Sequence, residues 1–515
     1  MSRFLLVSLT IKTILRETTL SRRREKLATM RSGLDLGDAY DATIQRIKAQ
    51  EEDRARLGMA TLMWISHSER PLNVVEICHA LAVKAGSTSF NVPSIRKVLS
   101  CCQGLAAVDT GSSTIRLIHF TLKKYLSSHA DLFNGAHAKI SETCLTYLNF
   151  QAIWGLSASP SRDPRGAPFL DYSSLYWGTH MRMELSARSR FLAAALLSQY
   201  SNHISAELLW KSTVEPCFRS HKPFSALHCI SYFGIAEVAD GFIKMRRWDV
   251  NQRDSAGLTP LMWAARHGRE EAVKLLLQQK YTEPDMRDTE YGRTALSWAA
   301  RSGHEGVVRI FLSQLFVKPG SMGHRWGKKS QAMGRLFGRK YVSPDGLDDG
   351  GQTPLSLAAE HGHDGVVGLL LGREDVGSDR PDNYGQTPLL LAAGNGHDRV
   401  AKLLLEREDV SPDRPDDDGQ TPLSLAARNG HDAVVGLLLG REDVSPDRPD
   451  NGGQTPLSWA ARNGRDGVVK LLLEREDVSL DRSDNRGKTP LSLATRYRHK
   501  GIVKLLRIGK AASPV

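Results

Sequence analysis

Apolar and polar positions repeat with a period of 34 residues through the C-terminal half of the chain. Each period has a Thr-Pro pair, a short run of Leu and Ala, a Gly, and a second run rich in Val and Leu. The threonine is suited to cap a helix that begins at the proline, and the glycine is suited to end it. Two short helices bury their apolar faces only by stacking on a neighbouring unit, so the period predicts an α-solenoid. The pairs begin at Thr353, Thr387, Thr421, Thr455 and Thr489, with looser copies at Thr259 and Thr294.

The N-terminal half has apolar residues at helical spacing but no such period. Three helical segments are followed by two β-prone segments that flank a Thr-Gly-Ser-Ser turn, which indicates a hairpin. This order predicts a small winged-helix domain. The helical segments run through 44–65, from Pro71 to Leu81 and over 95–102, and the β-prone segments cover 105–109 and 114–119.

The chain is therefore predicted to be mainly α, with three successive parts. A winged-helix-like domain of helices and a β-hairpin occupies 51–135, a helical linker occupies 136–223, and the α-solenoid occupies 224–515. A basic insertion at 318–342, which contains no acidic residue, enlarges one loop between repeat units.

Composition narrows the classes of function. With 41% apolar and 24% charged residues the chain has an ordinary globular composition, and no apolar run is long enough to cross a bilayer. Its six cysteines are scattered without paired spacing, which indicates reduced thiols and an intracellular protein; we expect the cytoplasm, with the nucleus as the alternative. The net charge is +12, yet residues 343–515 carry 22 Lys and Arg against 28 Asp and Glu. The net positive charge of the whole chain therefore does not indicate nucleic-acid binding by the repeats.

We assign no catalytic, cofactor-binding or metal-binding residue. The segment Gly323–Ser330 comes nearest to a phosphate-binding loop, but its spacing is wrong by one residue and no strand precedes it. A nucleophile elbow and paired Cys/His zinc spacing are both missing from the sequence. Recurring His-Asp pairs such as His363-Asp364 are best explained as helix-start residues bonded to turns, because a catalytic pair needs no copy in every unit. We therefore expect a non-enzymatic protein with no cofactor and no small-molecule substrate.

The repeated unit resembles the ankyrin repeat in its motifs Gln-Thr-Pro-Leu, Leu-Ala-Ala, Asn-Gly-His and Val-Val-x-Leu-Leu-Leu. This resemblance implies a surface that binds other proteins. His228 keeps the family's His after Leu, whereas later units have Ser or Leu there, so we expect weaker coupling between those units. Trp263, Trp298 and Trp459 replace a Leu and are predicted to pack rather than to contact a partner. About eight units are recognised by their Pro-equivalent position, at Ala226, Pro260, Ala295, Pro354, Pro388, Pro422, Pro456 and Pro490.

The N-terminal half resembles the GPI inositol-deacylase-type winged helix that follows the NTPase in fungal NACHT receptors with C-terminal ankyrin repeats. The resemblance implies that residues 1–50 are a helical remnant of the end of an NTPase module, with Phe4–Leu15 as its closing helix. We therefore expect a chain of the fungal NACHT/ankyrin receptor-like type that lacks the NTPase domain. The matching motifs are Tyr40-Asp41, Leu62–Ile65, Arg70–Leu72, Cys102–Leu105 and Ile118–Thr121.

A protein partner is expected on the concave surface of the repeats, across the tips of the extended turns and the exposed ends of the first helices. As a set these residues form an acidic ledge with one aromatic side chain, which favours a basic or polar protein surface. The candidates at the tips are Asp382, Asn383, Tyr384, Asp416, Asp417, Asp418, Asp450, Asn451, Asn485 and Arg486. Those at the ends of first helices are Arg428, Asn429, Arg462 and Asn463.

The competing hypothesis is nucleic-acid binding through the winged helix and the basic insertion. Its candidate recognition helix, at 95–102, offers Arg96 and Lys97, and Lys123 and Lys124 lie near it in the sequence. These are few cations for a phosphate footprint, so we consider nucleic acid the less favoured partner.

Overall fold

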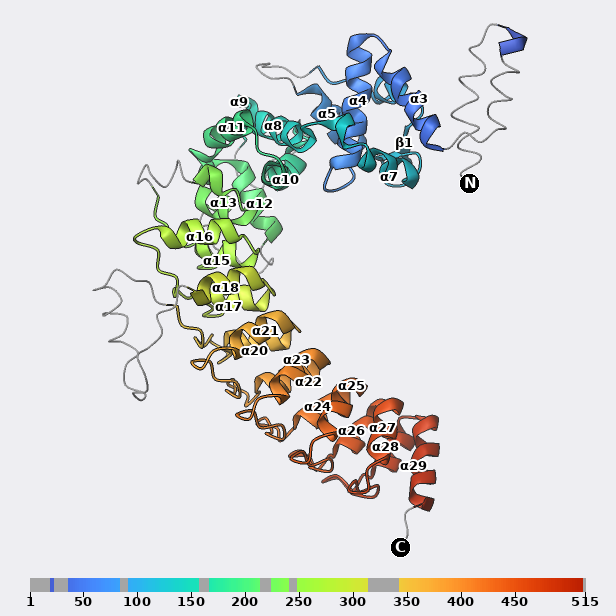
Figure 1. The fold of residues 1–515 in the computed structure, drawn as a ribbon, viewed down its shortest axis with the longest axis vertical. Helices are drawn as coiled ribbons and strands as arrows, with labels where there is room; N and C mark the ends of the chain where they lie inside the picture. Colours follow the sequence, from blue (N-terminus) through green and yellow to red (C-terminus); the bar gives the residue numbers. More distant parts are fainter. Residues whose placement is uncertain are drawn as a thin grey trace. The chain divides into compact units, whose positions relative to one another are not determined.

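The computed structural model describes residues 19–22, 36–83, 91–156, 166–213, 224–239, 248–313 and 342–512. They divide into an N-terminal body, Met1–Cys229, and a C-terminal body, Ile230–Val515 (Figure 1). The chain is mainly helical, and the part that the structure describes contains a single two-stranded sheet, as the sequence predicts. Phe4–Leu15, Gly323–Ser330 and all but the last residue of the basic insertion lie outside the described residues.

The N-terminal body contains the expected winged helix, formed by α4, α5 and α6 followed by the hairpin. Strands β1 and β2 are antiparallel, with Ala106 opposite Leu117 and Asp109 opposite Thr114. Its elements are α3 (Leu36–Lys48), α4 (Glu52–His67), α5 (Val74–Ala82), α6 (Ile95–Cys101), β1 (Ala106–Asp109), β2 (Thr114–Leu117), α7 (Phe120–Ser128), the 3₁₀ turn η1 (Ala130–Phe133), α8 (Ala136–Leu148), α9 (Gln151–Trp154), α10 (Leu170–Met183), α11 (Ala187–Leu197), the 3₁₀ turn η3 (Tyr200–Asn202) and α12 (Ile204–Thr213).

Close helix packing at Gly58 joins three helices of the winged helix. A Cβ at Gly58, in α4, would lie 2.6 Å from the carbonyl oxygen of Cys101 in α6 and 2.9 Å from Cγ2 of Ile47 in α3. The hydroxyls of Tyr40, in α3, and Thr121, in α7, are 2.8 Å apart. Helix α3, which the sequence places before the boundary at residue 50, thus packs into the core of the winged helix.

Aromatic and imidazole side chains join the winged helix to the helices that follow it. Trp64 of α4 meets the ring of Phe169 edge-on, with centroids 5.6 Å apart. Nδ1 of His137, in α8, is 2.8 Å from Nδ1 of the fully buried His180, in α10, so one of these nitrogens carries the proton and the other accepts it. Burial and the neighbouring imidazoles of His137 and His67 lower the pKa of His180 to about 3. The helical linker is therefore part of one packed body with the winged helix.

The C-terminal body consists of paired short helices, and each first helix begins where the Thr-Pro pattern predicts. Thr353 caps α20 by accepting a hydrogen bond from the N–H of Ser356, and equivalent threonines cap the other first helices that begin with proline. The described helices are α13 (Ala226–Phe233), α15 (Pro260–Arg266) with α16 (Glu270–Gln278), α17 (Ala295–Arg301) with α18 (Glu305–Ser313), α20 (Pro354–Glu360) with α21 (Asp364–Leu371), α22 (Pro388–Asn395) with α23 (Asp398–Leu405), α24 (Pro422–Asn429) with α25 (Asp432–Leu439), α26 (Pro456–Asn463) with α27 (Asp466–Leu473), and α28 (Pro490–Arg496) with α29 (Lys500–Ala512).

First helices pack on first helices and second helices on second helices along the whole array from α15 to α29 (Figure 1). The stack continues across the basic insertion, because α17 packs on α20 and α18 packs on α21. The insertion therefore enlarges a loop without dividing the solenoid.

A side chain at the start of each second helix donates a hydrogen bond to the end of the first helix in the preceding unit. His397 Nε2, for example, lies 3.0 Å from the carbonyl oxygen of Glu360. The ring passes over Gly362, whose φ is +76° and where a Cβ would lie 2.5 Å from His397 Nδ1. The other pairs are Arg269 with Tyr232, His304 with Arg266, His363 with Arg301, His431 with Gly394, Arg465 with Arg428 and His499 with Arg462.

These contacts confirm that the recurring histidines are helix-start residues, but each bonds to the end of the first helix in the preceding unit rather than to a turn. They also couple neighbouring units. The Ser that replaces the family's His after Leu bonds within its own unit, as Ser356 Oγ does to Thr353 Oγ1 at 3.0 Å. The inter-unit bond described above comes from the His or Arg after the Gly, so it is present in units that have Ser after Leu. The weaker coupling expected for those units stays a prediction.

Ion pairs add a further contact between units at the loops that follow the second helices. Arg448 Nη1 lies 3.0 Å from Asp413 Oδ2 and 2.9 Å from the carbonyl oxygen of Asp413. Burial raises the pKa of Asp413 although Arg448 opposes the shift. The same pair recurs as Arg380 with Asp345, Arg414 with Asp379 and Arg482 with Asp447.

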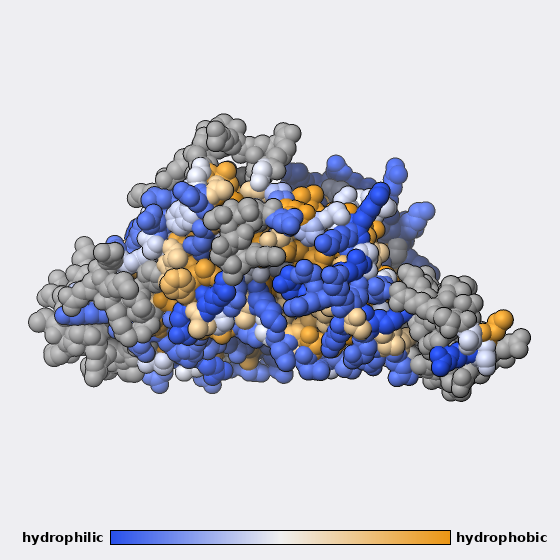
Figure 2. Space-filling view, turned by 90° about the horizontal axis from the view of Figure 1, so that it is seen from above, coloured by the Kyte–Doolittle hydropathy of each residue, from blue (hydrophilic) through white to orange (hydrophobic). Residues whose placement is uncertain are grey.

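No helix among the residues that the structure describes is long and apolar enough to cross a membrane. In the face seen in Figure 2, hydrophilic residues surround separate patches of apolar ones. Five cysteines in the described ranges are buried free thiols, and burial raises the pKa of Cys102 to about 12.

We predict that Gly362→Ala destabilises the array by roughly 1–3 kcal/mol, because alanine is strained at positive φ and its methyl group would displace the ring of His397. Gly368→Ala in the same unit is the matched control. It lies within α21, and no described atom outside the backbone of that helix comes within 4 Å of the place that a methyl group would take. The control is therefore expected to stabilise by roughly 0.5–1 kcal/mol. Denaturant unfolding followed by circular dichroism measures both, and equal midpoints for the two variants would contradict the close contact.

We predict that the N-terminal body loses stability as the pH falls from 6.5 towards 3. Unfolded His180 takes up a proton near its ordinary pKa of 6.5, whereas the folded residue does so only near 3, so acid favours the unfolded state by up to about 1.4 kcal/mol per pH unit. Hydrogen exchange of α8 and α10 at pH 7 and pH 5, corrected for intrinsic rates, measures the loss. His180→Gln is expected to be less stable at pH 7 but to depend less on pH. An equal pH dependence in both proteins would show that His180 is not responsible.

Candidate partner-binding surface

Each tip loop is held in shape by the aspartate that begins it. Oδ1 of Asp416 accepts hydrogen bonds from the backbone N–H groups of Asp418, at 3.0 Å, and Gln420, at 2.8 Å. Burial raises the pKa of this carboxyl group. Asp382 and Asp450 accept the equivalent pairs of bonds. The first aspartate of each tip loop is therefore occupied by its own turn.

The second residue of each tip loop ties it to the preceding loop. The backbone N–H of Asn451 donates to the carbonyl of Asp418 at 3.1 Å, and its Nδ2 donates to the carbonyl of Asp417 at 2.9 Å. Gly419 has φ +77°, and a Cβ there would lie 2.8 Å from the nitrogen of Asn451. Asn383 and Asn485 make the equivalent side-chain bonds. The asparagines predicted as partner contacts thus link neighbouring units.

The ends of the first helices are joined in a similar way. Nδ2 of Asn429 donates to the carbonyl of Gly394 at 2.6 Å, and Nδ2 of Asn463 donates to the carbonyl of Arg428 at 2.9 Å. The guanidinium of Arg428 bonds to Oε1 of Gln420 at 3.2 Å. These asparagines therefore join the ends of consecutive first helices, and Arg428 connects its helix to the residue that follows the tip loop of its own unit.

The three tryptophans that replace leucine are structural, as the sequence predicts. The indole N–H groups of Trp263, Trp298 and Trp459 each donate at 2.8 Å to an aspartate of the tip loop before them. Trp263 and Trp298 are buried. Trp459 is partly exposed, and the guanidinium carbons of Arg428 and Arg462 lie 4.6 Å and 5.2 Å from its ring centroid.

The side chains left over from these contacts are the third residues of the tip loops. Tyr384 is 70% exposed, although large apolar side chains are usually buried. Asp418 and Arg486 occupy the same position in later units and are also exposed. Asp417 adds an exposed carboxylate, while Asp382, Asp416 and Asp450 are only partly exposed and hold their turns. The ledge therefore presents less free negative charge than the sequence suggests.

Arg496 and Tyr497 belong to this surface but are absent from the sequence-based site. Arg496 lies in the last turn of α28, where Arg428 and Arg462 lie in α24 and α26. The spacing of 34 residues from Arg462 could have identified it.

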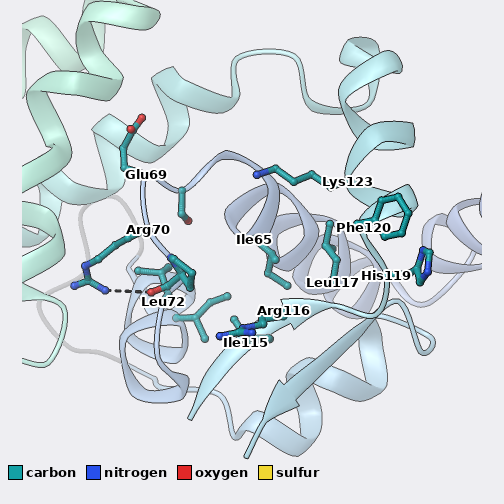
Figure 3. Close-up of a pocket in the computed structure, with 13 residues that line it drawn as sticks. Ile65, Glu69, Arg70, Leu72, Ile115, Arg116, Leu117, His119, Phe120 and Lys123 are labelled. Atoms are coloured by element: carbon teal, nitrogen blue, oxygen red, sulfur yellow. Dashed lines mark hydrogen bonds between the residues drawn. The ribbon is translucent and has the colours of Figure 1, made fainter. Parts of the chain in front are cut away.

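The winged helix contains a separate pocket of about 340 Å³. Figure 3 shows Ile65, Leu72 and Leu117 beside it, with charged side chains around them. Arg70, which lines this pocket, donates two hydrogen bonds to Glu76, at 2.9 and 2.6 Å. Arg116 forms an ion pair with Asp109 at 3.1 Å. Both arginines are thus already paired with carboxylates, and the lining also includes the exposed Lys123.

Comparison with protein families agrees with this geometry. The family described as ankyrin repeats (3 copies) matches residues 194–321, 328–416, 355–450, 407–483 and 442–514, which together cover more than half of the chain. The chain belongs to the ankyrin-repeat family. A second family, the winged helix domain of GPI inositol-deacylase, matches residues 34–138. Comparison with curated proteins gives no match. Ankyrin repeats generally mediate protein binding rather than catalysis, so this ankyrin array has a protein-interaction role in general terms.

We predict different effects for two nearby aspartates of one ankyrin tip loop. Asp416→Ala removes the acceptor of two backbone N–H groups and should destabilise the array by about 1–2 kcal/mol. Asp418→Ala is the matched control, because it makes the same change in charge at an exposed side chain and should shift stability by less than about 0.5 kcal/mol. Denaturant unfolding measures the free energy of unfolding of both variants. Equal losses of stability would refute the distinction between carboxylates that hold a turn and carboxylates that are free.

Proposed function

We propose that this protein is a non-enzymatic interaction scaffold or sensor whose partner, a protein, binds the concave surface of the ankyrin array. The partner lies across the tip loops and the ends of the first helices. The observation that carries the proposal is that the first residue of a tip loop holds its own turn and the backbone of the second is tied to the preceding loop, while Tyr384 and Asp418 at the third position are exposed. A frame fixed by its own hydrogen bonds loses little entropy when a partner binds.

The order of the domains supports a receptor-like role. A winged helix at 34–138 followed by ankyrin repeats is the order found in the C-terminal part of fungal NACHT receptors, which the sequence resembles. We propose on this ground that the ankyrin array is the sensing part of an NLR-like receptor. The buried free thiols support an intracellular, reducing compartment, and we propose the cytoplasm.

Nucleic-acid binding by the winged helix is the weaker proposal. Arg96 and Lys97 are exposed on α6, and Lys123 and Lys124 are exposed on α7. Against these cations, Arg70 and Arg116 are neutralised by Glu76 and Asp109. A salt-sensitive shift of duplex DNA by the full chain, abolished by Lys123→Gln and Lys124→Gln, would favour this alternative.

Site-specific photo-crosslinking tests the scaffold. A photoreactive phenylalanine at position 384 replaces an exposed tyrosine of a tip loop, and the same residue at position 402 replaces an exposed lysine of a second helix as the matched control. We expect a protein partner to crosslink from 384 and not from 402, and Asp418→Lys to reduce its yield severalfold. Asp450 is unsuitable for this test because its carboxylate holds a turn. Crosslinks of equal yield from both positions would count against the proposed surface.

A further inference from the structure

Three arginines occupy one position in three consecutive ankyrin units. Arg428, Arg462 and Arg496 lie in the last turns of α24, α26 and α28. These first helices pack side by side, α24 on α26 and α26 on α28. We call these three residues the arginine row.

Two aromatic rings alternate with the arginine row. The guanidinium carbons of Arg428 and Arg462 lie 4.6 and 5.2 Å from the ring centroid of Trp459. Those of Arg462 and Arg496 lie 5.7 and 6.0 Å from the ring centroid of Tyr497. A guanidinium held over a ring keeps its N–H edges available for a second interaction. The rings therefore hold the cations in place without neutralising them.

The arginine row has no carboxylate partner among the residues that the structure describes. Arg428 bonds to the neutral amide oxygen of Gln420. Other arginines of the same units behave differently, since Arg441 and Arg475 each lie 2.8 Å from an aspartate oxygen, of Asp443 and Asp477. Residues 343–515 carry 28 Asp and Glu against 22 Lys and Arg, yet their described part leaves these three cations without a carboxylate.

The tip loops beside the last two arginines do not supply the missing charge. Asn451, Gly452, Asn485 and Arg486 follow the turn-holding aspartates there, and none of them is acidic. Asp450 and Asp484 each accept backbone N–H groups of their own loops. An anionic ligand can thus approach Arg462 and Arg496 without meeting exposed carboxylates of these loops.

The spacing of the row selects the ligand. Packed helices lie about 8–10 Å apart. A segment in the extended polyproline-II conformation has three residues per turn and advances about 3.1 Å per residue, so its side chains three apart lie on one face and span one unit. We propose that the arginine row binds an extended acidic segment of the protein partner, with a carboxylate at every third residue. This inference rests on the proposed function and names the chemistry of its partner. A bidentate contact between each guanidinium and one carboxylate accounts for arginine at all three positions.

Binding of two synthetic peptides to the full chain tests the inference. Both are fluorescent and have the same composition of Glu, Gly and Ser, but one carries Glu at every third residue and the other carries its Glu residues consecutively. We expect the spaced peptide to bind at least severalfold more tightly, and its affinity to fall with added salt. Equal affinities would contradict the proposed register.

Variants then locate the binding site. Changing Arg428, Arg462 and Arg496 together to Gln is expected to weaken binding of the spaced peptide roughly tenfold to a hundredfold, as the loss of three surface ion pairs. Changing Lys402, Lys470 and Lys504 to Gln is the matched control, since these exposed cations lie on second helices and the change in charge is identical. If the two triple variants bind alike, the attraction is only that of net charge and the inference fails.

A third variant separates the rings from the charge. Trp459→Leu restores the residue found at this position in neighbouring units, Leu425 and Leu493, so it is compatible with the fold. We expect it to weaken the spaced peptide severalfold although all three arginines remain, because Arg428 and Arg462 lose the ring between them. Unchanged affinity would show that the rings do not organise the row. If a partner still crosslinks from position 384 in the triple arginine variant, the proposed scaffold function stands. The proposal that the partner supplies an acidic segment is then refuted.

Discussion

The whole array depends on one kind of contact between units. A glycine with positive φ is crossed at close range by a side chain of the next unit. At Gly362 the ring of His397 passes so close that a Cβ does not fit, and its N–H reaches the carbonyl of Glu360. Gly419 in a tip loop makes the same kind of approach, to the backbone of Asn451. A two-helix unit has too little core to be stable alone, so these contacts make neighbouring units one cooperative structure.

The same contacts determine which residues are left for binding. Polar groups of the frame, such as Asp416 and Asn451, satisfy backbone groups of their own loop or a neighbouring loop. Positions that differ between units, such as Tyr384 and Asp418, are exposed. Because the side chains of the frame are occupied, we propose that specificity lies at the exposed positions that differ between units. The arginine row is a special case, since its residues repeat but remain without a carboxylate in the described part of the array.

Much of the fold could be predicted from the sequence, because its signals are local. Thr421 before Pro422 fixes a helix start within four residues, and a turn between two β-prone segments fixes the hairpin. The candidate surface proposed from the sequence includes Arg428 and Arg462 but not Arg496. The bonding partners could not be predicted, since Asn451 and Asp417 are 34 residues apart and meet only when units stack. For the same reason the sequence did not reveal the bond that His397 makes to the preceding unit.

The sequence alone determined the helix pairs, their caps, the hairpin and the family, because each depends on short-range preferences repeated along the chain. The tertiary structure alone decided that the stack continues across the insertion, that α3 packs against the winged helix, and that the asparagines of the tips tie loops together. It also showed that Arg428, Arg462 and Arg496 form one row separated by aromatic rings. These features depend on which side chains meet across a unit boundary, and that is set by stacking distance rather than by position in the sequence.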